Sequence, residues 1–307
     1  ARESAPDVIG LGMSVLDLVQ VVEQFPAGEG VTRVKDSVLM GGGPVPTALC
    51  AASRLGAKTA ILDRIGDDWR GQLILSDYER FGVSTAHLLR ERGKRSSFGT
   101  VLVRRSDGER HLLFEEGDFS PFAMHDLPRN LLESCRILHL NGRHWPACRE
   151  AAHIVRKAGG LVSFDGGAHR YDEQHVQIFP FIDLLIVAAD FADRAVGVGD
   201  RPTQLARLGQ WGAQIVGITD GAQGSWFREA GSACFHQPAF PIAPIVDTTG
   251  CGDVFHGAFL ASAICGEPWT ECARVASAAA ALAATALGGR GRLADREELA
   301  AFLSAES

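Results

Sequence analysis

Residues 247–260 read DTTGCGDVFHGAFL, a short loop with two glycines that leads into an apolar helix. That end of a helix carries free N–H groups and the positive pole of the helix dipole. With glycines at 250 and 252 the backbone can approach a phosphate closely. Asp253 would then lie beside the anion, where a carboxylate is unfavourable unless it accepts a proton from an attacking hydroxyl. The spacing alone leaves an equal alternative, in which Asp253 only caps the helix.

Outward from this loop, short apolar runs alternate with helical stretches that end before glycine. Strands are expected at residues 7–12, 59–66, 136–140, 160–165, 183–188 and 214–219, and helices at 47–55, 70–81 and 148–158. The alternation predicts an α/β fold, a three-layer α/β/α sandwich with a mostly parallel central sheet, in one domain over residues 1–307. Residues 16–38 and 98–114 break this rhythm with extended, alternating runs, and we expect them to form a small antiparallel flap beside the sheet.

Composition excludes several classes of protein. The chain has 307 residues, of which 46% are hydrophobic and 22% charged, and its formal net charge is −7. No block of Lys and Arg occurs, so nucleic acid is not an expected partner. The longest run of small apolar residues, 275–289, is too short for a bilayer, so no membrane partner is expected either. Seven irregularly spaced cysteines favour a reducing compartment, and residues 1–6 do not read as a signal peptide. We therefore expect a cytoplasmic protein.

Residues 247–259 resemble the second signature of the PfkB, or ribokinase-like, family of sugar and nucleoside kinases. The usual form is D-T-x-G-A-G-D-x-F-x-G-A-F, and here only Cys251 departs from it. Further matches run along nearly the whole chain: GGGPVPT at 41–47, SRLG at 53–56, GDDWRG at 66–71, DGER at 107–110 and TDGAQG at 219–224. The resemblance implies a ribokinase-like fold in which the flap is a lid over the sugar. It also implies a homodimer formed through that lid.

The resemblance implies a role for each matching position. Asp253 would be the general base, and the N–H groups of Gly250, Cys251 and Gly252 would form the anion hole. The sugar would be bound by Asp17, Gly42 and Gly43. ATP would lie against Thr219, Gly221, Gly224 and Ala279. Asp247 and Thr249 fall where many relatives bind a monovalent cation, so potassium is an open cofactor beside ATP and Mg²⁺.

Two departures from the family pattern bear on substrate and metal. Thr47 replaces the asparagine of the first signature, which alters the hydrogen bonds offered to a sugar and puts ribose in doubt. The family's N-x-x-E, which organises magnesium-bound water, should fall near residues 188–191 and is not kept; Asp190 or Asp193 are its only nearby substitutes. Magnesium would then be held largely by the ATP phosphates.

The loop Asn141-Gly142-Arg143-His144 follows the strand expected at 136–140. Together with GGGPVPT it resembles the ketohexokinase-like branch, which includes sulfofructose kinases. Asn141 and Arg143 are therefore candidate sugar-binding residues, with Thr47. Arg143 would hold an anionic group on the sugar, or else lie in an ordinary surface loop.

These observations predict an ATP-dependent kinase that phosphorylates a primary hydroxyl of a small sugar, a ketohexose or a derivative. The alternatives are a non-catalytic sugar- or nucleotide-binding regulator on the same fold, and a nucleoside kinase. A dehydrogenase is disfavoured, because Gly10 and Gly12 are not followed by the third glycine of a dinucleotide fingerprint. His139 with His144, and His169 with His175, lack partners at metal-ligand spacing and read as ordinary histidines rather than ligands.

Overall fold

The computed structural model describes residues 5–306, and its largest feature is one nine-stranded sheet. From edge to edge its strands are β13 (Cys234–Gln237), β12 (Ser225–Glu229), β11 (Ile215–Thr219), β10 (Leu184–Ala188), β9 (Leu161–Gly166), β8 (Ile137–Leu140), β1 (Val8–Leu11), β4 (Thr59–Gly66) and β5 (Leu88–Glu91). The strands from β11 to β5 run parallel, and β12 and β13 extend one edge antiparallel. The predicted mostly parallel sheet is confirmed.

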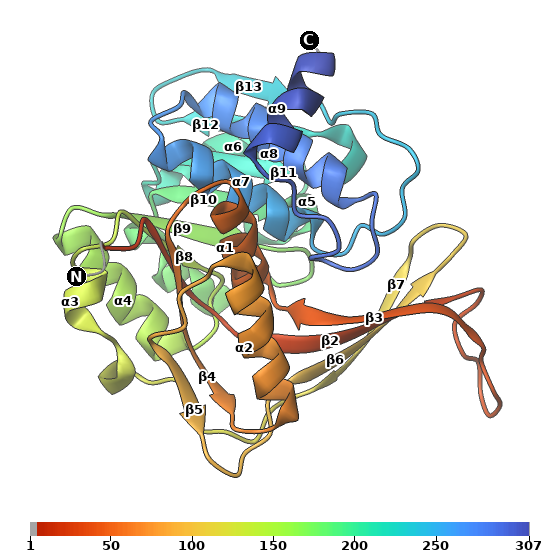
Figure 1. Ribbon diagram of the computed structural model, residues 1–307. Helices are drawn as coiled ribbons and strands as arrows, with labels where there is room; N and C mark the ends of the chain where they lie inside the picture. The colour runs from red at the N-terminus through yellow and green to blue at the C-terminus, as the bar shows by residue number, and fades with distance from the viewer. Residues whose placement is uncertain (1–4, 307) are drawn as a thin grey trace.

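Helices cover both faces of this sheet (Figure 1). One face carries α1 (Pro44–Arg54), α2 (Trp69–Phe81), α7 (Cys251–Ile264), α8 (Trp269–Ala283) and α9 (Arg296–Ala305). The other carries α3 (Arg129–Leu132), α4 (Trp145–Lys157), α5 (Ala189–Val196) and α6 (Arg201–Leu208). Neighbouring strand residues serve opposite cores, as Val8 and Ile9 of β1 do, because successive side chains point to opposite faces. The three layers follow from this alternation.

Each of the six expected strands forms within one residue of its predicted bounds. The helices α1 and α4 begin three residues earlier than expected, because prolines stand in their first turns. A proline there loses no helical hydrogen bond and has the φ that a helix needs. In the described residues, 5–306, no helix has the length and apolarity to cross a bilayer.

A second, four-stranded sheet extends from the body of the molecule (Figure 1). Its order is β3 (Val34–Gly42), β2 (Val15–Val22), β6 (Phe98–Arg104) and β7 (Arg110–Glu115), which matches the two segments predicted for the flap. The two hairpins β2–β3 and β6–β7 are antiparallel as predicted, but the β2–β6 pairing that joins them is parallel. The reason is topological. β2 follows β1 and β6 follows β5, and β1 and β5 run in the same direction in the main sheet. Both segments therefore leave the carboxyl ends of the strands in the same direction and pair parallel.

Candidate functional site

The first turn of α7 contains the residues predicted to form the anion hole. Its N-cap, Gly250, has a φ of 72°, and in the described part of the chain no side chain caps the helix. A Cβ on Gly250 would lie 2.6 Å from the Cα of Gly289, so only glycine fits this turn. Gly252 is exposed and has open space beside its Cα. The positive end of this helix thus has open space beside Gly252, and phosphate binding there stays a prediction.

Asp253 stands in that same first turn, with a second carboxylate beneath it. Asp165, in β9, is buried and lies within electrostatic range, and its Oδ1 is 3.2 Å from His256 Nε2 one turn further along α7. Burial, and then the Asp165 charge, raise the pKa of Asp253 to about 6, against the opposing charges of Arg170, His256 and Arg110. A carboxyl with this pKa is mostly ionised at neutral pH and accepts a proton more readily than an ordinary aspartate.

A buried histidine backs the Asp165–His256 pair. The ring of His139 in β8 lies 5.3 Å from the ring of His256, and its Nδ1 is 3.1 Å from the Ser163 hydroxyl. Burial, and then the charge of His256, lower the pKa of His139 to about 3, so this ring is neutral. Burial alone would raise the pKa of Asp165, but His256 and Arg170 hold it below its ordinary value. Asp165 is thus kept ionised, while the raised pKa makes Asp253 the more basic of the two carboxylates.

Asp17, which is predicted to bind the sugar, lies in β2 at the base of the lid. Its carboxylate lies over two glycines, Gly42 of β3 and Gly99 of β6, and a Cβ on either would collide with it. Burial raises the pKa of Asp17 to about 6, and the nearby Arg290 charge opposes this. Gly43 has a φ of 92°, and its Cβ position is blocked by the Met13 carbonyl. The glycine pair predicted to approach the sugar is thus required by the local packing.

The other residues assigned to the sugar sit in different surroundings. Thr47 is buried, and its hydroxyl accepts a hydrogen bond of 3.2 Å from Arg290 Nε. Asn141 is buried at the end of β8, and its Oδ1 accepts from the backbone N–H of Arg143 at 3.3 Å. The Arg143 side chain is exposed. Thr47 therefore meets another protein group, whereas Arg143 remains accessible.

The nucleotide-loop residues follow β11, at the same edge of the sheet. Thr219 ends the strand, Gly221 is exposed, and Gly224 has a φ of 86° where a Cβ would strike the Gln237 carbonyl. Ala279, in contrast, is 3% exposed and belongs to the core packed by α8. Its contact with adenine stays a prediction.

The position predicted for a monovalent cation is held by hydrogen bonds within the chain. Asp247 is buried; its Oδ1 accepts from the N–H and hydroxyl of Thr249 at 2.8 and 2.6 Å, and its Oδ2 accepts from Gly288 N–H at 2.9 Å. Asp190 accepts from the N–H of His169, and Asp193 from Gln204. Within residues 5–306, no three His, Cys, Asp or Glu side chains converge on a metal position.

Two buried groups that join parts of the site, Arg290 and His256, were not expected from the sequence, because neither lies in a position whose spacing marks it as functional. Asp165, also buried, ends the strand expected at residues 160–165, a position that is compatible with either the cleft or a simple turn. For Cys251, burial and the Asp247 charge raise the thiol pKa to about 12, so the thiolate is scarce beside the anion-binding turn.

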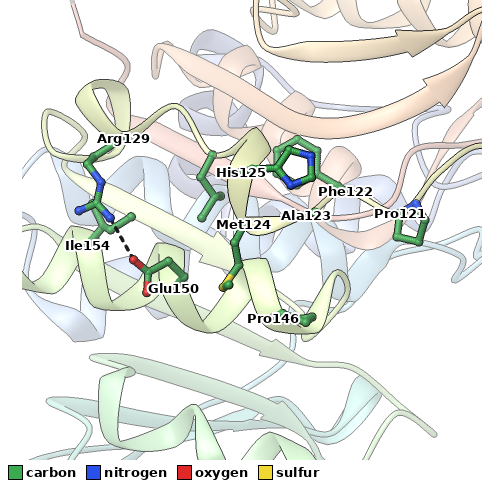
Figure 2. Close-up of a pocket in the computed structure, with 10 residues that line it drawn as sticks. Pro121, Phe122, Ala123, Met124, His125, Arg129, Pro146, Glu150 and Ile154 are labelled. Carbon is green, nitrogen blue, oxygen red and sulfur yellow. Dashed lines mark hydrogen bonds and ion pairs between the residues drawn. The ribbon is translucent and has the colours of Figure 1, made fainter.

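An apolar surface hollow lies elsewhere, against α4 (Figure 2). Phe122, Met124 and Ile154 line it, and the pair Arg129–Glu150, 3.1 Å apart, crosses its rim. None of the residues predicted for the catalytic, sugar or nucleotide positions is among those that line it. The chemistry described above therefore belongs to the carboxyl edge of the sheet, where open α/β sheets bind ligands.

Comparison with known proteins identifies the family and the fold. The model of the pfkB family carbohydrate kinases matches residues 6–295. A ribokinase from Arabidopsis thaliana is 27% identical over 97% of this chain and 81% of its own length, and a fructokinase from Vibrio alginolyticus is 29% identical over 86% and 91%. The structure of the Arabidopsis ribokinase complexed with ribose and ATP matches with a TM-score of 0.83 at 24% identity, covering 97% of this chain and 99% of that one. An adenosine kinase from Sinorhizobium meliloti gives 0.84 at 19% identity, covering 99% and 100%. The fold is therefore ribokinase-like, and the chain belongs to the pfkB family of carbohydrate kinases, phosphotransferases that act on a sugar hydroxyl.

Proposed function

We propose that this kinase uses ATP to phosphorylate the primary hydroxyl of a ketohexose or a derivative, with Asp253 as the general base. The observation that carries the proposal is the first turn of α7. A carboxylate with a pKa of about 6 stands there in a helix start that no side chain of the described residues caps and that has open space beside Gly252. A base and an anion hole in one turn are what phosphoryl transfer to a hydroxyl requires.

The reaction follows from these groups. Asp253, ionised at neutral pH, accepts the proton of the sugar hydroxyl as its oxygen attacks the γ-phosphorus of ATP. The N–H groups of Gly250, Cys251 and Gly252 donate to the phosphoryl oxygens, on which negative charge accumulates. Arg110 of the lid and Arg170 after β9 both act electrostatically on Asp253, so they add positive charge at the same place. The bond to the ADP oxygen breaks as the new P–O bond forms, and the proton remains on Asp253.

Magnesium fits this site only as a companion of ATP. No acidic cluster of the described residues can hold it, so we infer that the phosphates supply most of its ligands. Bound Mg²⁺ would neutralise phosphate charge. Thr219, Gly221 and Gly224 would lie along the nucleotide, at an edge where Gly224 leaves no room for a side chain. A potassium ion beside Asp247 and Thr249 would activate by steadying the turn that precedes Asp253.

The choice of a ketohexose rests on the loop after β8. Asn141 and the accessible Arg143 lie at the carboxyl end of that strand, and relatives include a fructokinase and a mouse ketohexokinase. Arg143 suits an anionic substituent on the sugar, which makes sulfofructose a test substrate. Other relatives are ribokinases and a nucleoside kinase, so ribose and nucleosides are the competing substrates.

We also propose that the lid forms a homodimer. Its last strand, β7, exposes three consecutive apolar residues, Leu112, Leu113 and Phe114, at 57%, 54% and 43% of their surface. Leu112 and Phe114 lie on one face of this strand and Leu113 on the other, and a second copy of the same lid packed on the first face would cover Leu112 and Phe114.

A coupled ADP-release assay with Mg²⁺ and ATP tests the function. The panel holds fructose, other ketohexoses, sulfofructose, ribose and nucleosides, with wild type, Asp253→Asn and Asp183→Asn. Asp183 is a suitable control because it also has a raised pKa, caused by burial, but lies before β10 at the opposite edge of the sheet. We expect ketohexose-dependent ADP release that falls roughly 100- to 10,000-fold in Asp253→Asn and persists in Asp183→Asn.

The panel also separates the alternatives. Full activity in Asp253→Asn would refute the base. A response to nucleosides alone would make the protein a nucleoside kinase. Silence across the panel, with sugar and ATP each raising the melting temperature, would identify a binding regulator.

A further inference from the structure

Arg290 is a buried arginine that contacts Gly42 and Thr47, two residues predicted to bind the sugar that lie far from it in the sequence. It follows α8, and its side chain is 1% exposed. Its guanidinium donates in three directions: Nη1 to Asp77 Oδ2 at 2.5 Å, Nη2 to the Gly42 carbonyl at 3.0 Å and Nε to the Thr47 hydroxyl at 3.2 Å. All three nitrogens of the fork are thus used, which a lysine cannot reproduce.

The Arg290–Asp77 ion pair binds the backbone of Gly41 and Gly42, at the base of the lid, through one N–H group and one carbonyl group. While Arg290 binds the Gly42 carbonyl, Asp77 Oδ2 accepts from the Gly41 N–H at 3.2 Å. The ion pair also fills the space beside Gly41, where a Cβ would collide with the guanidinium and meet Asp77 Oδ2 at 2.5 Å. Gly42 in turn lies against the Asp17 carboxylate. The place of Asp17 is therefore set by a backbone that Arg290 fixes.

The loop that carries Arg290 also contacts the phosphoryl-transfer turn. Gly288 N–H donates to Asp247 Oδ2, and Asp247 Oδ1 accepts from Thr249. Gly289 packs against Gly250, the N-cap of α7. Three successive residues, 288–290, thus contact both the sugar end and the anion-binding turn.

A polar chain continues from Arg290 to the loop after β8. The guanidinium carbon lies 5.5 Å from the centre of the Tyr78 ring, and the Tyr78 hydroxyl is 2.7 Å from Ser14 Oγ. Ser14 N–H donates to Asp63 Oδ2 at 2.6 Å, and Asp63 Oδ1 is 2.8 Å from His144 Nε2. Burying the Arg290–Asp77 ion pair costs desolvation energy that apolar packing would avoid. The pair is therefore better explained by the groups that it holds in place than by a gain in stability.

We propose that Arg290 is a positioning residue of the sugar site, whose buried fork fixes Gly41 and Gly42, and through them Asp17, relative to the phosphoryl-transfer turn. This role rests on the proposed sugar kinase function. It assigns to Thr47 an indirect part: its hydroxyl holds Arg290 and does not face the sugar. Arg290 touches neither reactant, so its loss should impair the binding and placement of the sugar and leave the nucleotide site intact.

The test compares Arg290→Met and Arg290→Lys with Arg292→Met. Arg292 lies two residues further on, and its guanidinium binds Glu298 and Thr285 of the C-terminal segment instead. Two readouts are used on each protein: hydrogen exchange of the backbone amides of residues 38–50, without any ligand, and the KM values for sugar and ATP. Melting temperatures verify that each variant is folded.

We expect both Arg290 variants to exchange faster over residues 38–50 while exchange over β10 and β11 is unchanged. The sugar KM should rise about 10- to 100-fold, the range that a misplaced binding group produces, with the ATP KM within about twofold of wild type. Arg292→Met should alter neither readout. Failure of Arg290→Lys to restore the sugar KM would support the fork geometry over charge alone.

Unchanged exchange over residues 38–50, or an unchanged sugar KM despite faster exchange, would overturn the proposal. So would equal rises in the sugar and ATP KM, which would indicate a general structural defect. If the wild type phosphorylates no sugar, faster exchange confined to residues 38–50 would still support the clamp, while the proposed function itself would fail.

Discussion

The pair of carboxylates at the transfer turn makes a quantitative prediction about pH. With a pKa of about 6, Asp253 is about 90% ionised at pH 7 and about 10% at pH 5. Because the base must be ionised to accept a proton, kcat should fall about tenfold between these values. Asp17 titrates in the same range and acts on sugar binding, so the measurement is kcat at saturating sugar.

Asp165→Asn tests the cause of that pKa. Removing the second negative charge should lower the pKa of Asp253 below about 6, while burial, the larger cause, keeps it above 3.8. The acid limb of the kcat profile should therefore move to lower pH, so that more than about 10% of the plateau remains at pH 5. Asp183→Asn should leave the limb in place. An acid limb that does not move in Asp165→Asn, or that moves to higher pH, would refute the electrostatic reasoning.

Three further changes test other parts of the molecule. Gly42→Ala places a methyl group against the Asp17 carboxylate and should raise the sugar KM about tenfold or more. The control Gly199→Ala, at a glycine with open space around it, should leave the sugar KM unchanged. Equal KM values in the two variants would contradict the packing argument. Cys251→Ala should keep full activity, and wild type should resist iodoacetamide at pH 8 because the Cys251 pKa is about 12; rapid inactivation would show that the thiol is reactive. Leu112→Glu should convert a dimer to a monomer in sedimentation velocity, and a monomeric wild type would rule out the lid interface.

A strand could be predicted from the sequence when both of its faces are buried, and was missed when they are not. Strands with both faces covered are apolar throughout, as Leu184–Ala188 is, and such runs bounded by turn residues were recognisable. Leu88–Glu91 carries two charges in four residues, and Ser225–Glu229, between β11 and the edge strand β13, is only partly buried and ends in two charged residues, so neither gave that signal. The parallel β2–β6 pairing was also beyond local pattern, since it depends on the direction in which two distant segments leave the main sheet.

The candidate site divides in the same way between local and distant causes. The helix start at Gly250 could be located from the sequence because its requirement is local: a glycine, here with a φ of 72°, and an acidic residue three positions later. The pKa of Asp253 could not be predicted, because Asp165 comes from another strand. Its partner His256 is on α7 itself, but a histidine one turn after an aspartate carries no signal without the fold.

The run Gly41-Gly42-Gly43 shows why a motif can be recognised before its physics is understood. The third glycine is needed for its own backbone, with a φ of 92°, and this requirement is visible in any glycine-rich turn. The second makes room for a carboxylate from the neighbouring strand, and the first makes room for an ion pair whose arginine lies 249 residues further along the chain. An alanine at position 41 would displace Arg290, so Gly41→Ala and Arg290→Met should weaken sugar binding through the same defect. The double variant should then cost little more than either single one, because each removes the same constraint. Additive losses would show that Gly41 is required for some other reason.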